Sequence, residues 1–265
     1  MPFLKEHQIQ KENGVYDKRN QINDLTGKEW LFSTRSVKTK NYSFYFDIKK
    51  ILTAGFIDFM PIELISELIT TFSKSGANII DPICNFGSIG YATSLVNEKR
   101  VFHGYGYIEN SNVNFSKPFK NKHTFFSSRY VEKEFNLRDK EEKVLLMTEL
   151  IFTSLKSKLR QIQLLEFEKI LKNSLFNLLN KDLDINYIII SIQNTKDYDN
   201  YIYNTKNIFD IVTSYNYVLK SELIWKIFET EFLRIKDYLE WKNPGSKENN
   251  LLLNDKRILI FKKEL

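Results

Sequence analysis

The chain has 265 residues, of which 42% are hydrophobic and 27% charged, enough to form one fairly large domain or one domain with an arm. Its 39 basic and 33 acidic residues leave a net charge of +6, which is compatible with a phosphate-bearing partner but does not require one. A single cysteine, Cys84, and only three histidines argue against a disulfide framework and against a metal site built from Cys and His ligands.

Membrane and secretion signals are not found in the sequence. No apolar run approaches the roughly 18 residues that a membrane-spanning helix needs. The N-terminal sequence MPFLKEHQIQKENG lacks the apolar stretch of a signal peptide. We therefore expect a soluble, cytoplasmic protein that binds neither a membrane nor a metal.

Residues 1–50 are polar and rich in aromatic side chains, and we expect them to form an N-terminal arm ahead of a main domain at 51–265. Turn signals occur in the arm at Asn13-Gly14 and Thr26-Gly27. After the second turn, the sequence of residues 30–37 (WLFSTRSV) alternates well enough to predict a short strand or an extended segment.

The main domain begins with a helix and then alternates strands and helices. Residues 61–73 repeat apolar side chains at helical spacing behind Pro61, and Gly76 lies just past the predicted end. Further helices are predicted over 88–98, 155–178 and 208–215. Strands are predicted over 78–82, 101–108, 123–127, 143–148, 187–192, 218–225 and 257–261.

This alternation predicts an α/β fold, in which helices cover both faces of a mostly parallel sheet of seven strands. The continuous β-branched run of residues 187–192 is typical of a strand that is buried on both faces. No crossover helix of full length separates the last two predicted strands, so we expect them to pair antiparallel.

A candidate ligand site follows the first strand of this sheet. The strand ends at Asp81-Pro82 and leads through Asn85 and Gly87 into a helix; Gly87 allows close backbone approach, and Asn85 tolerates a positive φ. The second strand ends about twenty residues later at Glu109, whose carboxylate suits ribose hydroxyls. Together these features indicate a nucleoside-containing ligand. The alternative is that Glu109 caps a helix and Asp81 simply ends a strand in a sheet that binds nothing.

Four parts of the chain carry a family resemblance. The first is 23–37, and the second is 59–73, in which Phe59-Met60-Pro61 leads the helix. The third is 80–88 together with the strand end at 105–109, and the fourth is the set of strands at 188–195, 221–226 and 258–263. In order and spacing they resemble the amino-directed DNA methyltransferases, which use S-adenosylmethionine to methylate adenine N6 or cytosine N4. The resemblance implies a Rossmann-like methyltransferase fold with S-adenosylmethionine as the cofactor. It assigns cofactor binding to Phe59, Pro61, Asp81, Pro82, Asn85, Gly87, Ser88 and Glu109.

The catalytic tetrapeptide of that family is missing. In the family the fourth strand ends in Asp, Asn or Ser, two prolines and an aromatic residue, which accept the hydrogens of the target amine and stack on the flipped base. Here the strand runs into Glu149-Leu150-Ile151-Phe152, and no two of the five prolines are adjacent. We expect Glu149 to be an altered acceptor and Phe152 a stacking ring. Alternatively, Phe152 is the first core residue of the next helix; a weaker match at 116–119 comes too soon after the second strand.

The segment 228–254, between the last two predicted strands, interleaves basic and aromatic residues, a composition suited to gripping phosphates and stacking on bases. Alternatively, residues 229–239 form an amphipathic helix that covers the sheet edge. The candidate nucleic-acid contacts are Arg35, Lys236, Trp241, Lys242 and Lys247.

Three functions stay open on the sequence alone. The first is a DNA amino-methyltransferase with an altered site. The second is a non-catalytic methyltransferase-like subunit that binds DNA or an active methyltransferase partner in a modification or restriction system. The third is a methyltransferase for RNA or a small molecule. No block of sequence is large enough for an obvious target-recognition domain, which indicates short specificity, a partner subunit or no sequence reading at all. The partners expected are DNA and either a methyltransferase subunit or a second copy in a homodimer.

Overall fold

The computed structural model describes residues 4–33, 37–38, 56–58, 60–82, 88–96, 100–105, 124–126, 143–148, 150–152, 165, 167–169, 171–173, 175–176, 185–192, 195–197, 200–202, 204–226 and 255–264. The described strands are β1 (Gln8–Lys11), β2 (Gly14–Asp17), β3 (Val37–Lys38), β4 (Phe56–Asp58), β5 (Asn78–Asp81), β6 (Val101–Tyr105), β7 (Thr124–Phe126), β8 (Lys143–Thr148), β9 (Leu150–Phe152), β10 (Tyr187–Ile192), β11 (Thr195–Asp197), β12 (Asn200–Ile202), β13 (Tyr217–Lys226) and β14 (Asp255–Lys263). The described helices are α1 (Gly27–Ser33), α3 (Ile62–Phe72), α4 (Ser88–Leu95) and α6 (Asn204–Thr213).

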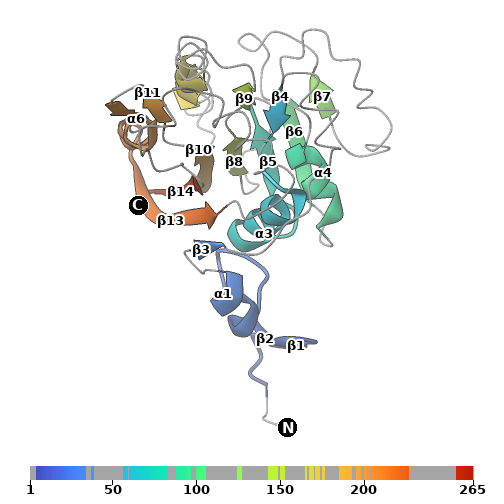
Figure 1. Ribbon diagram of the computed structural model, residues 1–265. Coiled ribbons are helices and arrows are strands. Elements are labelled where there is room, and N and C mark those ends of the chain that lie inside the picture. The colour runs from blue at the N-terminus through green and yellow to red at the C-terminus, as the bar shows by residue number, and fades with distance from the viewer. Residues whose placement is uncertain are drawn as a thin grey trace.

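The central sheet has the strand order β3-β13-β14-β10-β8-β5-β6-β7 (Figure 1). Neighbours pair in parallel except on both sides of β14, which is antiparallel to β10 and to β13. Apart from β3, strands β6 and β7 lie on one side of β5, and β8 and β10 lie on the other. The last strand in sequence, β14, lies between β10 and β13. This is a Rossmann-like methyltransferase fold, and it confirms the predicted parallel sheet with an antiparallel last strand. The short strand β3 makes eight described strands where we expected seven.

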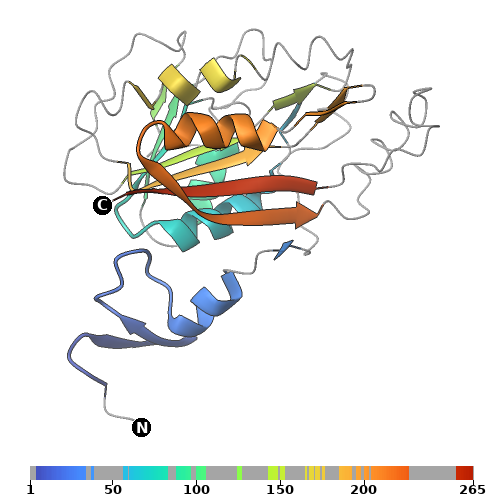
Figure 2. The same cartoon turned by 90° about the vertical axis from the view of Figure 1, so that its left-hand side faces the viewer.

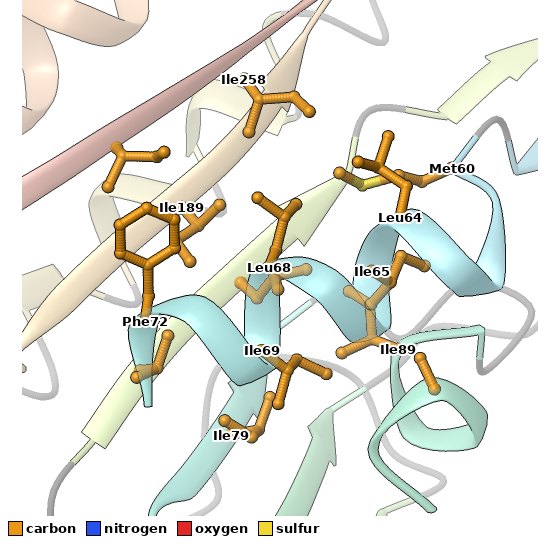
Figure 3. Close-up of a cluster of buried hydrophobic side chains, with 14 of the residues drawn as sticks. Met60, Leu64, Ile65, Leu68, Ile69, Phe72, Ile79, Ile89, Ile189 and Ile258 are labelled. Atoms are coloured by element: carbon orange, nitrogen blue, oxygen red, sulfur yellow. The ribbon is translucent and has the colours of Figure 1, made fainter. Parts of the chain in front are cut away.

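Helix α3 covers one face of this sheet. Pro61 stands at its N-cap with φ −59°, and the helix buries the apolar stripe predicted from the sequence. Its buried side chains form a first core with the sheet residues facing them (Figure 3). The first core comprises Met60, Ile62, Leu64, Ile65, Leu68, Ile69, Phe72, Ile79, Ile89, Ala92, Phe102, Val144, Leu146, Tyr187, Ile189, Leu223, Trp225, Ile258 and Ile260. Each fully buried Leu or Ile contributes about 1.5–3 kcal/mol, so this face holds α3 on the sheet.

The opposite face carries a second core. It joins α6 and helical residues of the segment 165–176 to the sheet, so helices lie on both faces as expected (Figure 2). Strand β10 contributes alternately to the two cores, and all six of its residues are buried. The second core comprises Ile80, Leu145, Met147, Phe167, Leu171, Leu175, Ile185, Ile188, Ile190, Ile192, Ile208, Ile211, Val212, Tyr217, Leu259 and Phe261.

The strand predicted at residues 30–37 is wrong over its first part, because residues 27–33 form helix α1. The cause is a capping box. The Thr26 amide donates to the Glu29 carboxylate at 2.8 Å, while the Glu29 amide donates to the Thr26 hydroxyl at 3.3 Å. These two bonds satisfy groups that would otherwise be left open at the helix start. Among the described residues of the predicted segment, only Val37 is in a strand, β3, which continues to Lys38.

Residues 4–33 pack at the end of the molecule where α3 finishes (Figures 1 and 2). The side-chain amide of Asn23 donates to the Thr71 carbonyl at 2.6 Å, and the Ser75 amide donates to Asp24 Oδ2 at 2.7 Å. The Trp30 ring meets Phe72 edge to face, with centroids 6.5 Å apart. The segment 71–77 links α3 to the start of β5, so these contacts lie at the amino-terminal edge of the sheet. The division into an arm at 1–50 and a domain at 51–265 stays a prediction.

Among the described residues, no helix has the length and apolar character needed to cross a membrane.

Candidate functional site

The centre of the candidate site is the carboxyl end of β5. The chain leaves β5, forms α4 and returns as β6 on one side, while β8 lies on the other side. In open α/β sheets, ligands bind in the crevice at this reversal of strand order. Asp81 is the last residue of β5, is 3% exposed and is in register with Gly104 of β6. The predicted residues Asp81 and Pro82 therefore stand, both buried, at the topological switch point.

Helix α4 packs unusually close to the sheet at Gly90. A Cβ at Gly90 would lie 2.7 Å from Phe102 Cε1 and 3.0 Å from Cδ1, too near for any larger residue. Phe102 is fully buried in β6, so its ring has little room to move. Only glycine allows this spacing between helix and strand.

Gly90 completes a fingerprint that the sequence analysis missed. Asn85, Gly87 and Gly90 have the spacing of the Gly-x-Gly-x-x-Gly dinucleotide-binding turn, with Asn85 at the first glycine. In that turn the third glycine is the one that permits close packing of helix on strand, which is the contact observed between Gly90 and Phe102. The spacing was present in the sequence, but we read only its first two positions.

The start of α3 lies in the same cluster as the first turn of α4. Met60 is 2% exposed and, with Ile65, belongs to the first core together with Ile89, the second residue of α4. Figure 3 shows Ile65 and Ile89 next to each other. Across the same helix pair, the Ser66 hydroxyl donates to the Ala92 carbonyl at 3.3 Å. The fold thus brings Pro61, at the N-cap of α3, and the α4 start at Ser88 to the same part of the molecule.

The segment after β8 forms a strand, β9, that pairs antiparallel with β4. The register places Phe56 opposite Phe152, Ile57 opposite Ile151 and Asp58 opposite Leu150. Our alternative that Phe152 begins the core of a helix is wrong, because Phe152 is the last residue of β9. The absence of prolines is the physical reason: residues 150–152 keep the backbone N–H groups that a ladder uses and that the family's two prolines would lack.

Several predicted site residues lie outside the described part of the chain. Among the cofactor candidates these are Phe59, Asn85, Gly87 and Glu109; among the catalytic candidates, Glu149; among the nucleic-acid contacts, Arg35, Lys236, Trp241, Lys242 and Lys247. Their roles, and that of Ser88 as a cofactor ligand, stay predictions. Within the described ranges, no group of three or more His, Cys, Asp and Glu side chains is arranged to hold a metal ion.

No protein-family model matches the chain, and no curated protein matches it. One similar solved structure is a NADB-Rossmann superfamily protein from Streptococcus agalactiae, with 9% identity over 78% of this chain and 69% of that chain and a TM-score of 0.42. A second is a SAM-dependent methyltransferase from Aquifex aeolicus, with 15% identity over 82% of this chain and 98% of that chain and a TM-score of 0.41. A third is M. jannaschii TYW2 in complex with AdoMet, with 9% identity over 99% of this chain and 89% of that chain and a TM-score of 0.40. These likenesses are distant, and the fold is assigned here from the strand order and register of the sheet.

Proposed function

We propose that this chain binds S-adenosylmethionine at the carboxyl end of β5 and transfers its methyl group to an amine nitrogen of a DNA base. The observation that carries the proposal is the unit β5–α4–β6, with buried Asp81 at the switch point and Gly90 packed on Phe102. A close approach of α4 to the sheet is what a nucleotide-binding turn needs. The proline-led start of α3, near the first turn of α4, supports the methionine side of the same pocket.

Each predicted residue has a role in this pocket. Glu109 accepts hydrogen bonds from the ribose hydroxyls, and the turn at Asn85 and Gly87 lets the backbone approach the nucleoside. Phe59 and Pro61 close over the methionine part. Asp81 and Pro82 fix the start of the turn, and Ser88 opens the helix behind it. When bound, the cofactor supplies an electrophilic methyl group on a sulfonium; the protein supplies position and electrostatics.

The test is S-adenosylmethionine binding, measured by calorimetry on the unmodified chain and on variants. Asp81→Ala and Glu109→Ala should abolish the binding heat. Asp210→Ala is the matched control, because Asp210 is an exposed acid on α6 at the far side of the sheet. Unchanged affinity in both site variants, or no binding by the unmodified chain, would reject the pocket.

One observation favours a second function, that of a non-catalytic methyltransferase-like subunit. Leu150 and Ile151 stand where the family has its two prolines, and both residues pair in the β4–β9 ladder. A subunit of this kind binds DNA or an active methyltransferase partner and supports methylation or restriction. Methyl-labelled cofactor incubated with duplex DNA separates the two, since only an active enzyme transfers label by itself.

DNA contact is proposed for Arg35 and for the basic and aromatic residues of 228–254. Binding through phosphates depends steeply on salt, because each neutralised phosphate releases counterions. Replacing Lys236, Lys242 and Lys247 together by Ala should weaken binding to a labelled duplex and reduce the salt slope by about three. Trp241→Ala should weaken binding without changing that slope, because a stacking ring releases no counterion.

A further inference from the structure

A groove of about 890 Å³ runs between residues 11–33 and the outer side of α3. One wall is the stripe of α3 that begins at Glu63 and ends at Thr70, on the side of the helix turned away from the sheet. The opposite wall comes from residues 11–33, including α1, and Leu95 and Val96 line the groove at the end of α4. The volume lies within the range of binding sites in proteins, about 300–1,000 Å³.

The groove combines apolar surface with an excess of acidic residues. Leu95 is 51% exposed, and Leu25 on the opposite wall is half-buried. Four acidic residues and two lysines line the groove, although the whole chain has a net charge of +6; they are Asp24, Glu29, Glu63, Glu67, Lys11 and Lys28. Glu63 and Glu67, one turn apart, place two of these charges on α3 itself. Such a surface opposes the phosphates of a nucleic acid and suits a partner that is both apolar and basic.

The same chain exposes a stripe of that chemistry elsewhere. The described helical residues of the segment 165–176 expose Leu165 (65%) and Phe176 (56%), with exposed Lys169 and Lys172 between them. At helical geometry, intervals of four, three and four residues place these side chains on one face. The other face of the segment is buried in the second core. Neither lysine forms an ion pair with another described residue, so both charges are available to a partner.

The charges of the groove and of this stripe are spaced alike. Glu63 and Glu67 are four residues apart, Lys169 and Lys172 are three apart, and side chains at either spacing are neighbours about 5–6 Å apart on a helix. Each lysine can therefore face one glutamate when the two helical stripes lie side by side. Figure 2 shows the helical residues of 165–176 (yellow) and residues 4–33 (blue) on opposite sides of the molecule, so one chain cannot fill its own groove.

We propose that the groove is the docking site of a second copy of this chain, which inserts its stripe from Leu165 to Phe176. Because the two surfaces differ and lie on opposite sides of the chain, the contact is head-to-tail, and each assembly ends with one open groove and one open stripe. The inference does not rest on the proposed function, since neither surface contains a residue assigned to the cofactor site.

The experiment measures self-association of the full chain by sedimentation equilibrium, over a range of protein concentrations and at low and high salt. The unmodified chain should form oligomers that grow with concentration and weaken at high salt, because salt screens exposed ion pairs. A groove variant, Glu63→Lys with Glu67→Lys, and a stripe variant, Lys169→Glu with Lys172→Glu, each set like charges against each other. Each should lower the association constant at least about tenfold.

Recovery by opposite charges separates docking from misfolding. A mixture of the groove and stripe variants should associate again, because the reversed groove of one then meets the reversed stripe of the other. A chain that carries all four substitutions should also associate. Lys18→Glu with Lys220→Glu is the control, since both lysines are exposed and lie outside the two surfaces, and it should associate like the unmodified chain. A monomeric unmodified chain, unchanged association of either variant, or no recovery in the mixture overturns the inference.

Discussion

A buried hydroxyl at the carboxyl edge of the central sheet lacks the kind of partner, within the described residues, that a buried side chain at the amino-terminal edge has. At the amino-terminal edge, the Arg100 side chain is fully buried and its guanidinium donates to the Ser73 hydroxyl and to the Ser73 carbonyl, both at 2.8 Å. Asp24 lies 3.8 Å from the same guanidinium and accepts the Ser75 amide. At the carboxyl edge, buried Asp81 stands at the switch point and the buried Ser191 hydroxyl has no partner within the described residues.

We expect this difference to separate polar groups that hold the fold from polar groups that serve a ligand. Arg100 has its hydrogen-bond partners in Ser73, and its ion pair with Asp24 ties residues 4–33 to the body of the domain. A group that fully pairs inside the protein is a structural feature. We therefore expect changes at the amino edge to alter stability alone, and changes at the carboxyl edge to alter binding or turnover more than stability.

The largest expected effect on stability is at Arg100. Replacing it by Met should cost about 3 kcal/mol of unfolding free energy, because the Asp24 carboxylate and the Ser73 groups lose their buried partner. Arg257→Met is the control, since the Arg257 pair with Glu222 is partly exposed and should contribute under about 1 kcal/mol. Urea unfolding measures both. If Arg100→Met weakened S-adenosylmethionine binding under conditions where the chain is folded, the two edges would not be independent.

A smaller effect, on both stability and cofactor affinity, is expected at Gly90. An alanine Cβ 2.7 Å from the Phe102 ring should cost about 1–3 kcal/mol by overpacking. Because α4 must then move off the sheet, cofactor affinity should fall about tenfold or more in calorimetry. Gly27→Ala is the matched control. A Cβ added at Gly27, the first residue of α1, would meet nothing within 4 Å, so this variant should be neutral or stabilising. Equal cofactor affinity in Gly90→Ala and the unmodified chain would show that the close packing is unrelated to the pocket.

The helix cap in residues 26–29 should contribute about 1 kcal/mol and have no effect on cofactor binding. Burial raises the pKa of Glu29, but hydrogen bonds from the Thr26 amide and hydroxyl and from Asn13 outweigh it and lower that pKa. Because the folded pKa is below the ordinary value of 4.5, the stabilisation is fully present above pH 4.5 and is lost as pH falls through the folded pKa. Thr26→Ala should lower the unfolding midpoint at neutral pH. Glu29→Gln should reduce the loss of unfolding free energy at acid pH. The same loss in this variant as in the unmodified chain would contradict the assignment.

Long segments with one strong period were predictable from the sequence. Strands 143–148 and 187–192 have the bounds we expected, and the helix predicted at 61–73 is present at 62–72, because each buries a continuous apolar face. The position of Asp81 at the end of a strand was predictable as well, because the strand before it is a buried apolar segment. In residues 30–37 an apparent alternation competed with a capping box, and the capping box determined the structure.

The β4–β9 ladder could not be predicted from local pattern. Each strand has three residues, and the two strands lie far apart in the sequence, one before α3 and the other after β8. Such pairing depends on where α3 and β8 bring the two segments, which is tertiary information. The sequence showed that the tetrapeptide was missing at 149–152, but not that residues 150–152 pair with residues 56–58.

The smallest expected effect on stability, with opposite sign, is at Ser191. Alanine removes a buried hydroxyl that has no partner among the described residues, so the chain should gain about 1 kcal/mol, a rise of roughly 2–4 °C in unfolding midpoint. If that hydroxyl serves the candidate site at the carboxyl edge, the more stable variant should transfer methyl groups more slowly, as residues kept for function against stability do. Ser221→Ala, a half-buried serine of β13, should change neither property. A loss of stability in Ser191→Ala would mean that the hydroxyl is already paired, and that the carboxyl edge at this point resembles the amino edge.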